Sequence, residues 1–390
     1  MSKSIIYDSI VDNQSTGRKV PMLLEHADIY DSVEKAVFNW TFEDSARSCS
    51  TTTATTHIFR YSVGLLSGWW LELTPDASAV WDNGHYWIGT AIEEVELITG
   101  GKVFMKYTGD QLQEYTWFFN NKFGPETRTH LKTLMDAGSG ATGALSVFCP
   151  ILCPGQSCVL GEKNQPINLN LSQSPFDIKI KIRAGNVISK TNALVINRVR
   201  LHRREWQVPE DQAKAYNKFS MVDFNYISDL TETLTINTSS NRTIQQAFDS
   251  TGNAECLGLF VRAVRNADVN TEFERFVGQE LTELKLQVNN QDLYIHGSTQ
   301  QARFMQLIDN ASLPFDSNST SFQYFIPLVP HLNPNMKPYK NKGHHGISLS
   351  KVIPKLITTC SAATGTYQLF ISSINKCTFV IENGVGSLVR

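Results

Sequence analysis

The sequence predicts an all-β protein made of two similar units in tandem, with short helical insertions. Three observations lead to this prediction. Phe, Tyr, Val, Ile and Thr gather in short runs that are separated by Asn, Gly, Ser, Asp and Pro. The 390-residue chain exceeds the roughly 250–300 residues at which a single hydrophobic core stops growing. Several elements of its first half also recur in the same order in its second half.

Seven segments have the composition or the alternation of β-strands. Apolar and polar residues nearly alternate in Asp177–Ile182 and Leu281–Val288, as in half-buried strands. The other five are rich in β-branched or aromatic residues: Thr51–Gly64, Ile92–Ile98, Ala193–Leu201, Leu230–Ile236 and Leu257–Val264. Many short strands with turn residues between them are typical of a β-sandwich or barrel.

Four segments are predicted to be short helices between strands. Pro125–Met135 and Pro209–Phe219 open with Pro and an acidic first turn, which is a typical helix start. The other two are Asp110–Lys122, which follows Gly109, and Thr299–Ile308.

The polar segment at Pro209 divides the chain into two nearly equal parts. We therefore expect an N-terminal arm at 1–29, a first unit at 30–208, a helical linker at 209–218 and a second unit at 219–390. Each unit is long enough for an eight-stranded jelly roll with decorated loops.

The internal repeat consists of a hairpin followed by an apolar strand interrupted by prolines. In the first half, Ile92–Lys106 turns at Gly100-Gly101 and Val147–Pro154 follows. In the second half, Leu281–Ile295 turns at Asn289-Asn290 and Tyr324–Pro330 follows. Because proline removes a backbone donor, the interrupted strands should lie at a sheet edge or carry a bulge.

Charge argues against direct contact with nucleic acid. The net charge is -2, with 35 basic and 37 acidic residues, and 1–21 contains only Lys3, Arg18 and Lys19 as cations. After Met1 we see no secretory leader, and no apolar run approaches the ~18–20 residues of a membrane helix. Seven scattered cysteines fit reduced thiols in a cytosolic setting better than a disulfide framework.

Histidines and cysteines offer two candidate metal sites, and neither matches a known ligand pattern. Cys149, Cys153 and Cys158, with His202 further on, lack the paired C-x2-C spacing of zinc sites. His331, His344 and His345 lack the acid that a cupin-type site would place after the histidine pair. We expect buried structural thiols and loop histidines, and therefore no metal site.

Acids near tryptophans suggest a sugar cleft as the alternative function. Glu93, Glu94 and Glu96 lie on one predicted strand. A tryptophan-rich segment contains Asp76, Asp82, Trp69, Trp70, Trp81 and Trp87. Tryptophan is also common in hydrophobic cores and at protein interfaces, and we prefer this interpretation of the segment to a sugar cleft. We expect no catalytic or cofactor-binding residue, and the sequons at Asn39, Asn170, Asn237, Asn241, Asn310 and Asn318 fit ordinary loop composition.

Five segments resemble the double-jelly-roll major capsid proteins of nucleocytoplasmic large DNA viruses, virophages and polinton-like viruses. The family's "IGG" turn is similar to Val95–Val103 (VELITGGKV), and its "PLPFWF" strand to Phe148–Pro154 (FCPILCP). Val288–Leu293 (VNNQDL) is similar to its "NG-x-D-R" turn, and FIPLVP at 325–330 to its strand ending in "aLxP". Leu369–Val389 (LFISSINKCTFVIENGVGSLV) is similar to the family's C-terminal strand and its "GMxGL" end.

The resemblance covers most of the chain from about Ile92 onward and implies a structural role rather than an enzyme. It implies homotrimers of pseudo-hexameric outline that tile the icosahedral capsid of a double-stranded DNA virus. The implied partners are neighbouring capsomers, minor capsid or penton proteins and an internal membrane. The implied location is the virion, after synthesis in the host cytoplasm or a virus factory. No cofactor and no direct nucleic-acid contact are implied.

Overall fold

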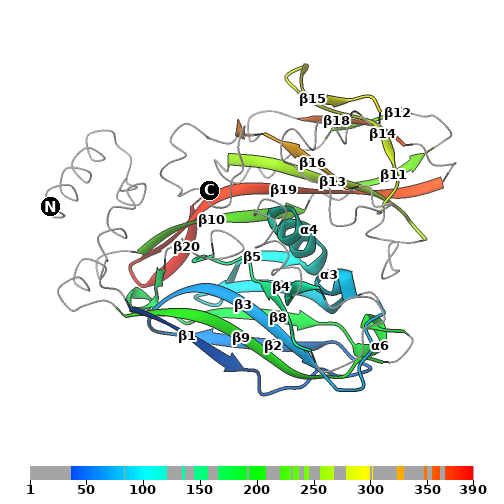
Figure 1. The fold of residues 1–390 in the computed structure, drawn as a ribbon. Coiled ribbons are helices and arrows are strands. Elements are labelled where there is room, and N and C mark those ends of the chain that lie inside the picture. Colours follow the sequence, from blue (N-terminus) through cyan, green and yellow to red (C-terminus); the bar gives the residue numbers. More distant parts are fainter. Residues whose placement is uncertain are drawn as a thin grey trace, which may run out of the picture.

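The structure, a computed structural model, describes most of the chain from Val37 onward. The described residues are 37–82, 84–120, 134–136, 145–156, 166–190, 193–207, 220–229, 232–236, 241–245, 255–267, 278–298, 301, 323–328, 347–348, 354–360 and 365–389. Their strands form four antiparallel sheets (Figure 1). None of the helices in these residues is long and apolar enough to span a membrane.

The first sandwich consists of two sheets, with strand orders β1-β9-β3-β6 and β2-β8-β4-β5; β7 pairs with β3. Its strands are β1 (Val37–Asp44), β2 (Thr55–Tyr61), β3 (Leu65–Pro75), β4 (Ile92–Thr99), β5 (Lys102–Thr108), β6 (Val147–Pro150), β7 (Ile167–Asn168), β8 (Phe176–Ile182) and β9 (Ile196–Gln207). Its helices are η2 (Gly84–Tyr86), α3 (Trp87–Ala91), α4 (Gly109–Asn120), η3 (Leu169–Leu171) and α6 (Gly185–Ile188).

The second sandwich has strand orders β10-β19-β13-β16 and β12-β18-β14-β15; β11 and β20 pair with β19, and β17 pairs with β13. Its strands are β10 (Ser220–Asp229), β11 (Glu232–Ile236), β12 (Asn241–Gln245), β13 (Glu255–Arg265), β14 (Leu281–Val288), β15 (Gln291–His296), β16 (Tyr324–Pro327), β17 (Ile347–Ser348), β18 (Lys355–Cys360), β19 (Gly365–Glu382) and β20 (Val385–Val389).

The two sandwiches share the same strand order, to which the second adds β11 and β20, and this confirms the predicted all-β fold and the predicted repeat. The order β1-β9-β3-β6, with β7 on β3, corresponds to β10-β19-β13-β16, with β17 on β13. The order β2-β8-β4-β5 corresponds to β12-β18-β14-β15. No described strand pair joins the two sheets of either sandwich, so the units are open sandwiches, as in jelly rolls.

Both predicted hairpin turns form, and they have the same backbone conformation. Gly100 and Gly101 have φ of 57° and 74°, and Asn289 and Asn290 have φ of 53° and 62°. Two successive residues at positive φ make the tight turn whose twist matches antiparallel strands. Glycine has no Cβ to clash there, and asparagine tolerates this region better than other residues do.

The proline-interrupted strands lie at sheet edges, as predicted. Among the described strands, β6 ends at Pro150 and pairs only with β3, and β16 ends at Pro327 and pairs only with β13. The predicted helix at Asp110–Lys122 is α4 (Gly109–Asn120). The predicted helices at Pro209–Phe219 and Thr299–Ile308 lie outside the described residues except for Gln301, and so does Pro125–Met135 except for its last two residues.

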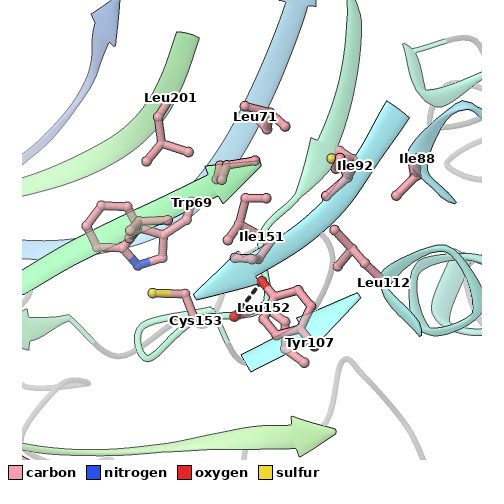
Figure 2. Close-up of a cluster of buried hydrophobic side chains, with 14 of the residues drawn as sticks. Trp69, Leu71, Ile88, Ile92, Tyr107, Leu112, Ile151, Leu152, Cys153 and Leu201 are labelled. Carbon is pink, nitrogen blue, oxygen red and sulfur yellow. Dashed lines mark hydrogen bonds between the residues drawn. The ribbon is translucent and has the colours of Figure 1, made fainter. Parts of the chain in front are cut away.

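The core of the first sandwich lies between its two sheets and beneath α3 and α4. Figure 2 shows Trp69 and Leu71 of β3 facing Ile92 of β4 and Leu112 of α4, all of them fully buried. The hydroxyl of buried Tyr107 donates to the Leu152 carbonyl at 2.9 Å, which satisfies the one polar atom of this ring.

The arm at 1–29 and the linker at 209–218 lie outside the described residues. The described strands of the first sandwich fall within 37–207 and those of the second within 220–389. The boundaries at 30, 208 and 219 remain a prediction.

Candidate assembly surface

Two of the three cysteines singled out in the sequence are buried structural thiols. Cys149 and Cys153 are fully buried in the core of the first sandwich, and burial raises the pKa of both thiols well above the ordinary value. Cys158 lies outside the described residues. His202 lies on the opposite, outer face of its sheet and is hydrogen-bonded to Glu72. Among the described residues no three His, Cys, Asp or Glu side chains group as a metal site would require.

The glutamates of the predicted acidic strand face lysines. On β4, Glu93 pairs with Lys181 at 2.7 Å, and Glu96 pairs with Lys179 at 2.6 Å. Glu94 pairs with Lys106 on β5 at 2.6 Å. A glycosidase needs two carboxylates that face each other across a substrate. These carboxylates instead form a ladder of ion pairs along one exposed sheet face.

The tryptophans of the tryptophan-rich segment contribute to the hydrophobic core and do not form an exposed sugar-binding surface. Trp69, Trp81 and Trp87 are buried, and Trp70 is half-buried. Asp76 accepts hydrogen bonds from Ser78 and Asn197, and Asp82 accepts one from the Lys190 backbone at 2.7 Å. These contacts stabilise turns. His331, His344 and His345, the second candidate metal site, lie outside the described residues.

The sequons divide between exposed and undescribed positions. Asn39 on β1 and Asn170 in η3 are exposed. Asn237, Asn310 and Asn318 lie outside the described residues, and the side chain of Asn241 on β12 is not described.

A buried Cys–His pair, which the sequence analysis missed, joins Cys49 to His57. The thiol Sγ lies 3.4 Å from Nε2 of His57, whose Nδ1 is 2.8 Å from Oγ of Ser45. His57 is fully buried, and burial raises the pKa of Cys49 to about 12. A reactive cysteine needs an accessible thiolate, so this pair is structural. The eight-residue separation has no motif that could have revealed it.

His57 makes stability depend on pH. Burial, helped by the charge of Arg47, lowers the pKa of folded His57 from 6.5 to about 4. The neutral ring is therefore favoured in the folded state, and its contribution is complete above pH 6.5 and lost as the pH falls toward 4. We expect the unfolding free energy of the wild type, minus that of His57→Gln, to fall by about 2–3 kcal/mol from pH 7 to pH 4. Chemical denaturation at several pH values measures it, and a pH-independent difference would contradict this account.

One outer face of the first sandwich combines exposed aromatic rings with arginines. We call it the Phe42 face; it comprises Trp40, Phe42, Glu72, Phe148, Arg200, His202 and Arg204. Trp40 is 48% exposed and Phe42 is 55% exposed. The Arg200 guanidinium lies 3.9 Å from the centre of the Phe42 ring, and that of Arg204 lies 4.7 Å from the Trp40 ring. Exposed aromatic and arginine side chains together are typical of protein interfaces.

A buried carboxylate holds the centre of the Phe42 face in place. The side chain of Glu72 is 6% exposed, accepts a hydrogen bond from His202 Nε2 at 2.7 Å and another from Ser146 at 2.8 Å. Burial alone would raise the pKa of Glu72, but these hydrogen bonds and the charge of Arg200 outweigh it and lower the pKa. Glu72 is thus ionised and paired, and it orients the cations around it.

The two sandwiches contact each other along the β10-β19-β13-β16 sheet. Phe379 of β19 lies 5.1 Å from Phe104 of β5 and 6.0 Å from Phe176 of β8, measured between ring centres. The Gln173 backbone N–H donates to the Gly384 carbonyl at 2.8 Å. Arg262 of β13 is 2% exposed and lies 3.4 Å from Glu114 of α4. An apolar contact with a buried ion pair therefore joins the sandwiches.

Comparison with known proteins identifies the fold. No family model matches the chain, and neither does any curated protein sequence. Among solved structures, VP54 of PBCV-1, fitted into a reconstruction of the virophage Sputnik, is similar with a TM-score of 0.67 at 11% identity, over 92% of this chain and 98% of that chain. The Faustovirus major capsid protein is similar with a TM-score of 0.57 at 10% identity, over 97% of each chain.

The mavirus major capsid protein is also similar, with a TM-score of 0.52 at 11% identity, over 89% of this chain and 90% of that chain. These similarities span both sandwiches and agree with the repeated strand order. The chain has the double-jelly-roll fold. The first sandwich is its first jelly roll, and the second sandwich is its second.

Proposed function

We propose that this chain is the major capsid protein of an icosahedral double-stranded DNA virus and acts as a structural subunit without catalytic activity. The observation that carries the proposal is the presence of two jelly rolls of the same topology in one chain. It is supported by the similarity to capsid proteins of PBCV-1, Faustovirus and mavirus. The acids and tryptophans of the sugar-cleft alternative lie in ion pairs, turns and core, and they give that alternative no support.

The oligomer we propose is a homotrimer. Three copies supply six similar jelly rolls, which in a ring give a threefold trimer a pseudo-hexagonal outline. Such a block tiles a flat facet with nearly equivalent edges. We place the boundary between the jelly rolls in the linker 209–218 and treat 1–29 as an arm toward neighbouring subunits. An obligate interface of this kind buries on the order of 2,000 Å² or more.

The further partners we propose are neighbouring capsomers, minor capsid or penton proteins and an internal membrane, all in the virion. A net charge of -2 fits a shell that does not bind the genome directly.

The mass of the purified full chain tests the trimer. Light scattering should give three times the chain mass of 43.7 kDa, over a wide range of protein concentration. A protein that stays monomeric at high concentration would contradict the proposal.

A further inference from the structure

The contact between the two jelly rolls has a defined geometry of face against edge. The face is the outer side of the β10-β19-β13-β16 sheet, where Ile227, Phe260, Phe325 and Ile374 are buried. They belong to the same apolar cluster as the core of the first jelly roll, not to the core of the second. The edge is β5, the last of the described strands in its sheet, whose Phe104 packs on Phe379 near the end of β19.

Strand pairing matches this covered face to the Phe42 face, position by position. Pro150 pairs with Trp70 in the first jelly roll as Pro327 pairs with Gly258 in the second. Continuing the two registers, Glu72 corresponds to Phe260, His202 to Ile374 and Phe42 to Ile227. The positions that are covered in the second jelly roll are thus the ones that form the Phe42 face in the first. That face is open to solvent at Trp40 and Phe42.

The two hairpins correspond in the same way. Both hairpins have a two-residue turn at positive φ and a register shift at the same place, Leu97/Ile98 in one and Leu286/Gln287 in the other. The residue skipped by this shift is Phe104 on β5 and Leu293 on β15. Phe104 is the ring that packs on Phe379 across the jelly rolls, whereas Leu293 is 44% exposed.

Among the described residues, the Phe42 face and the edge of β15 both expose large apolar side chains. β15 is the edge strand of its sheet and exposes Leu293 and Ile295. An exposed apolar edge strand is normally covered in native proteins. Figure 1 shows β15 at one end of the molecule and β1 with β9 at the other, so the two surfaces cannot meet within one copy.

We propose that the Phe42 face of one copy binds the β15 edge of a second copy, in the manner in which the second jelly roll covers β5 within the chain. The inference rests on the proposed trimer. It names the interface between neighbouring copies of the trimer, which we call the seam. Repeating the same contact alternately within and between copies closes a ring, as a head-to-tail interface must to avoid forming a filament.

The charges of the two surfaces support a second copy of the chain as the binding partner. On the outer side of the β1-β9-β3-β6 sheet the cations Arg198, Arg200 and Arg204 outnumber Asp44 and Glu72. Along the β14–β15 hairpin and the residue before it, Glu280, Glu283 and Asp292 outnumber Lys285. Opposite net charges on the two surfaces favour a heterologous pairing over the pairing of either surface with itself.

Charge insertion into the seam tests the proposal in the full chain. Phe42→Asp and Leu293→Asp should each raise the concentration at which half of the trimer dissociates by about thirtyfold or more. The matched control is Ile58→Asp on β2, since Ile58 is 54% exposed, close to the 55% of Phe42, but lies on the other sheet. Light scattering over a dilution series measures the dissociation, and thermal unfolding checks that each variant is folded.

Cross-linking between differently tagged copies gives a direct readout. Copies with Phe42→Cys and copies with Leu293→Cys, co-expressed and treated with a short thiol cross-linker, should form a mixed-tag dimer, which the wild type should not form. If the wild type is a trimer, yet both Asp variants dissociate like Ile58→Asp and no mixed-tag dimer forms, the seam is wrong and the proposed trimer stands. A wild type that is always monomeric would overturn both.

Discussion

Replacing Arg262 by methionine is expected to lower the free energy of unfolding by about 3–5 kcal/mol. The guanidinium lies 3.4 Å from Glu114 and 4.0 Å from Asp110, and its centre is 5.1 Å from that of the Phe370 ring. Glu114 is itself buried in α4. Methionine fills the space of the arginine stem but leaves a buried carboxylate without its cationic partner, which costs far more than the ion pair contributes. Urea denaturation measures the loss.

Two further variants isolate the buried charge as the cause. Adding Glu114→Gln to Arg262→Met removes the buried negative charge that has lost its arginine and should restore more than half of the loss. Lys181→Met breaks the ion pair with Glu93 at the surface, where both side chains are more than a third exposed, and should cost less than about 1 kcal/mol. Equal losses in Arg262→Met and Lys181→Met would contradict the role assigned to Arg262.

Replacing Trp69 by alanine is expected to cost about 3–5 kcal/mol, because it opens a cavity at the centre of the first jelly roll. The ring is fully buried and packs against Tyr61 and Phe176, with ring centres 5.2 Å and 6.1 Å away. Its Nε1 also donates to the Pro154 carbonyl at 2.9 Å, which becomes an unsatisfied acceptor in the variant. Thermal or chemical denaturation measures the loss.

Trp69→Phe separates the cavity from the hydrogen bond, since it keeps an aromatic ring and removes the indole donor. It should lose less than half of what Trp69→Ala loses. As a surface control, Val63→Ala truncates a side chain that is 70% exposed and should change stability by less than about 0.5 kcal/mol. A loss in Trp69→Ala no greater than that of Val63→Ala would show that Trp69 does not support the core.

The elements that could be predicted from sequence are those in which local pattern and tertiary environment agree. Leu281–Val288 was predicted with its observed bounds, because one side of β14 faces the core and the other faces water. Gly100-Gly101 and Asn289-Asn290 mark the two hairpins, because few other residues tolerate two successive positive φ values. The prolines indicated edge strands for the same kind of local reason.

Elements whose pattern and environment diverge were missed or cut short. β9 was predicted to end at Leu201 but continues to Gln207, because its last residues have the charged composition of a loop. Their side chains find hydrogen-bond partners across strands instead, such as Glu72 for His202. β1 and β3 were not predicted. β3 shows no alternation, since nearly all of its residues are buried, on one face by the core and on the other by paired side chains.

The candidate surface was beyond sequence reasoning for a related reason. Trp40, Phe42, Glu72 and Arg200 come from three strands, and only strand register brings them together. The sequence indicated two repeated halves, but the inequivalence of the covered and open faces appears only when the two registers are compared. The absence of a catalytic or cofactor-binding residue remains a prediction.

Projection images of the purified oligomer test the central claim most directly. If two equivalent jelly rolls per chain serve to build a shell, averaged negative-stain images viewed along the threefold axis should show a ring of six lobes with a hexagonal outline. A three-lobed or elongated particle, or single particles of one chain, would contradict the proposal that this double jelly roll is a capsid subunit.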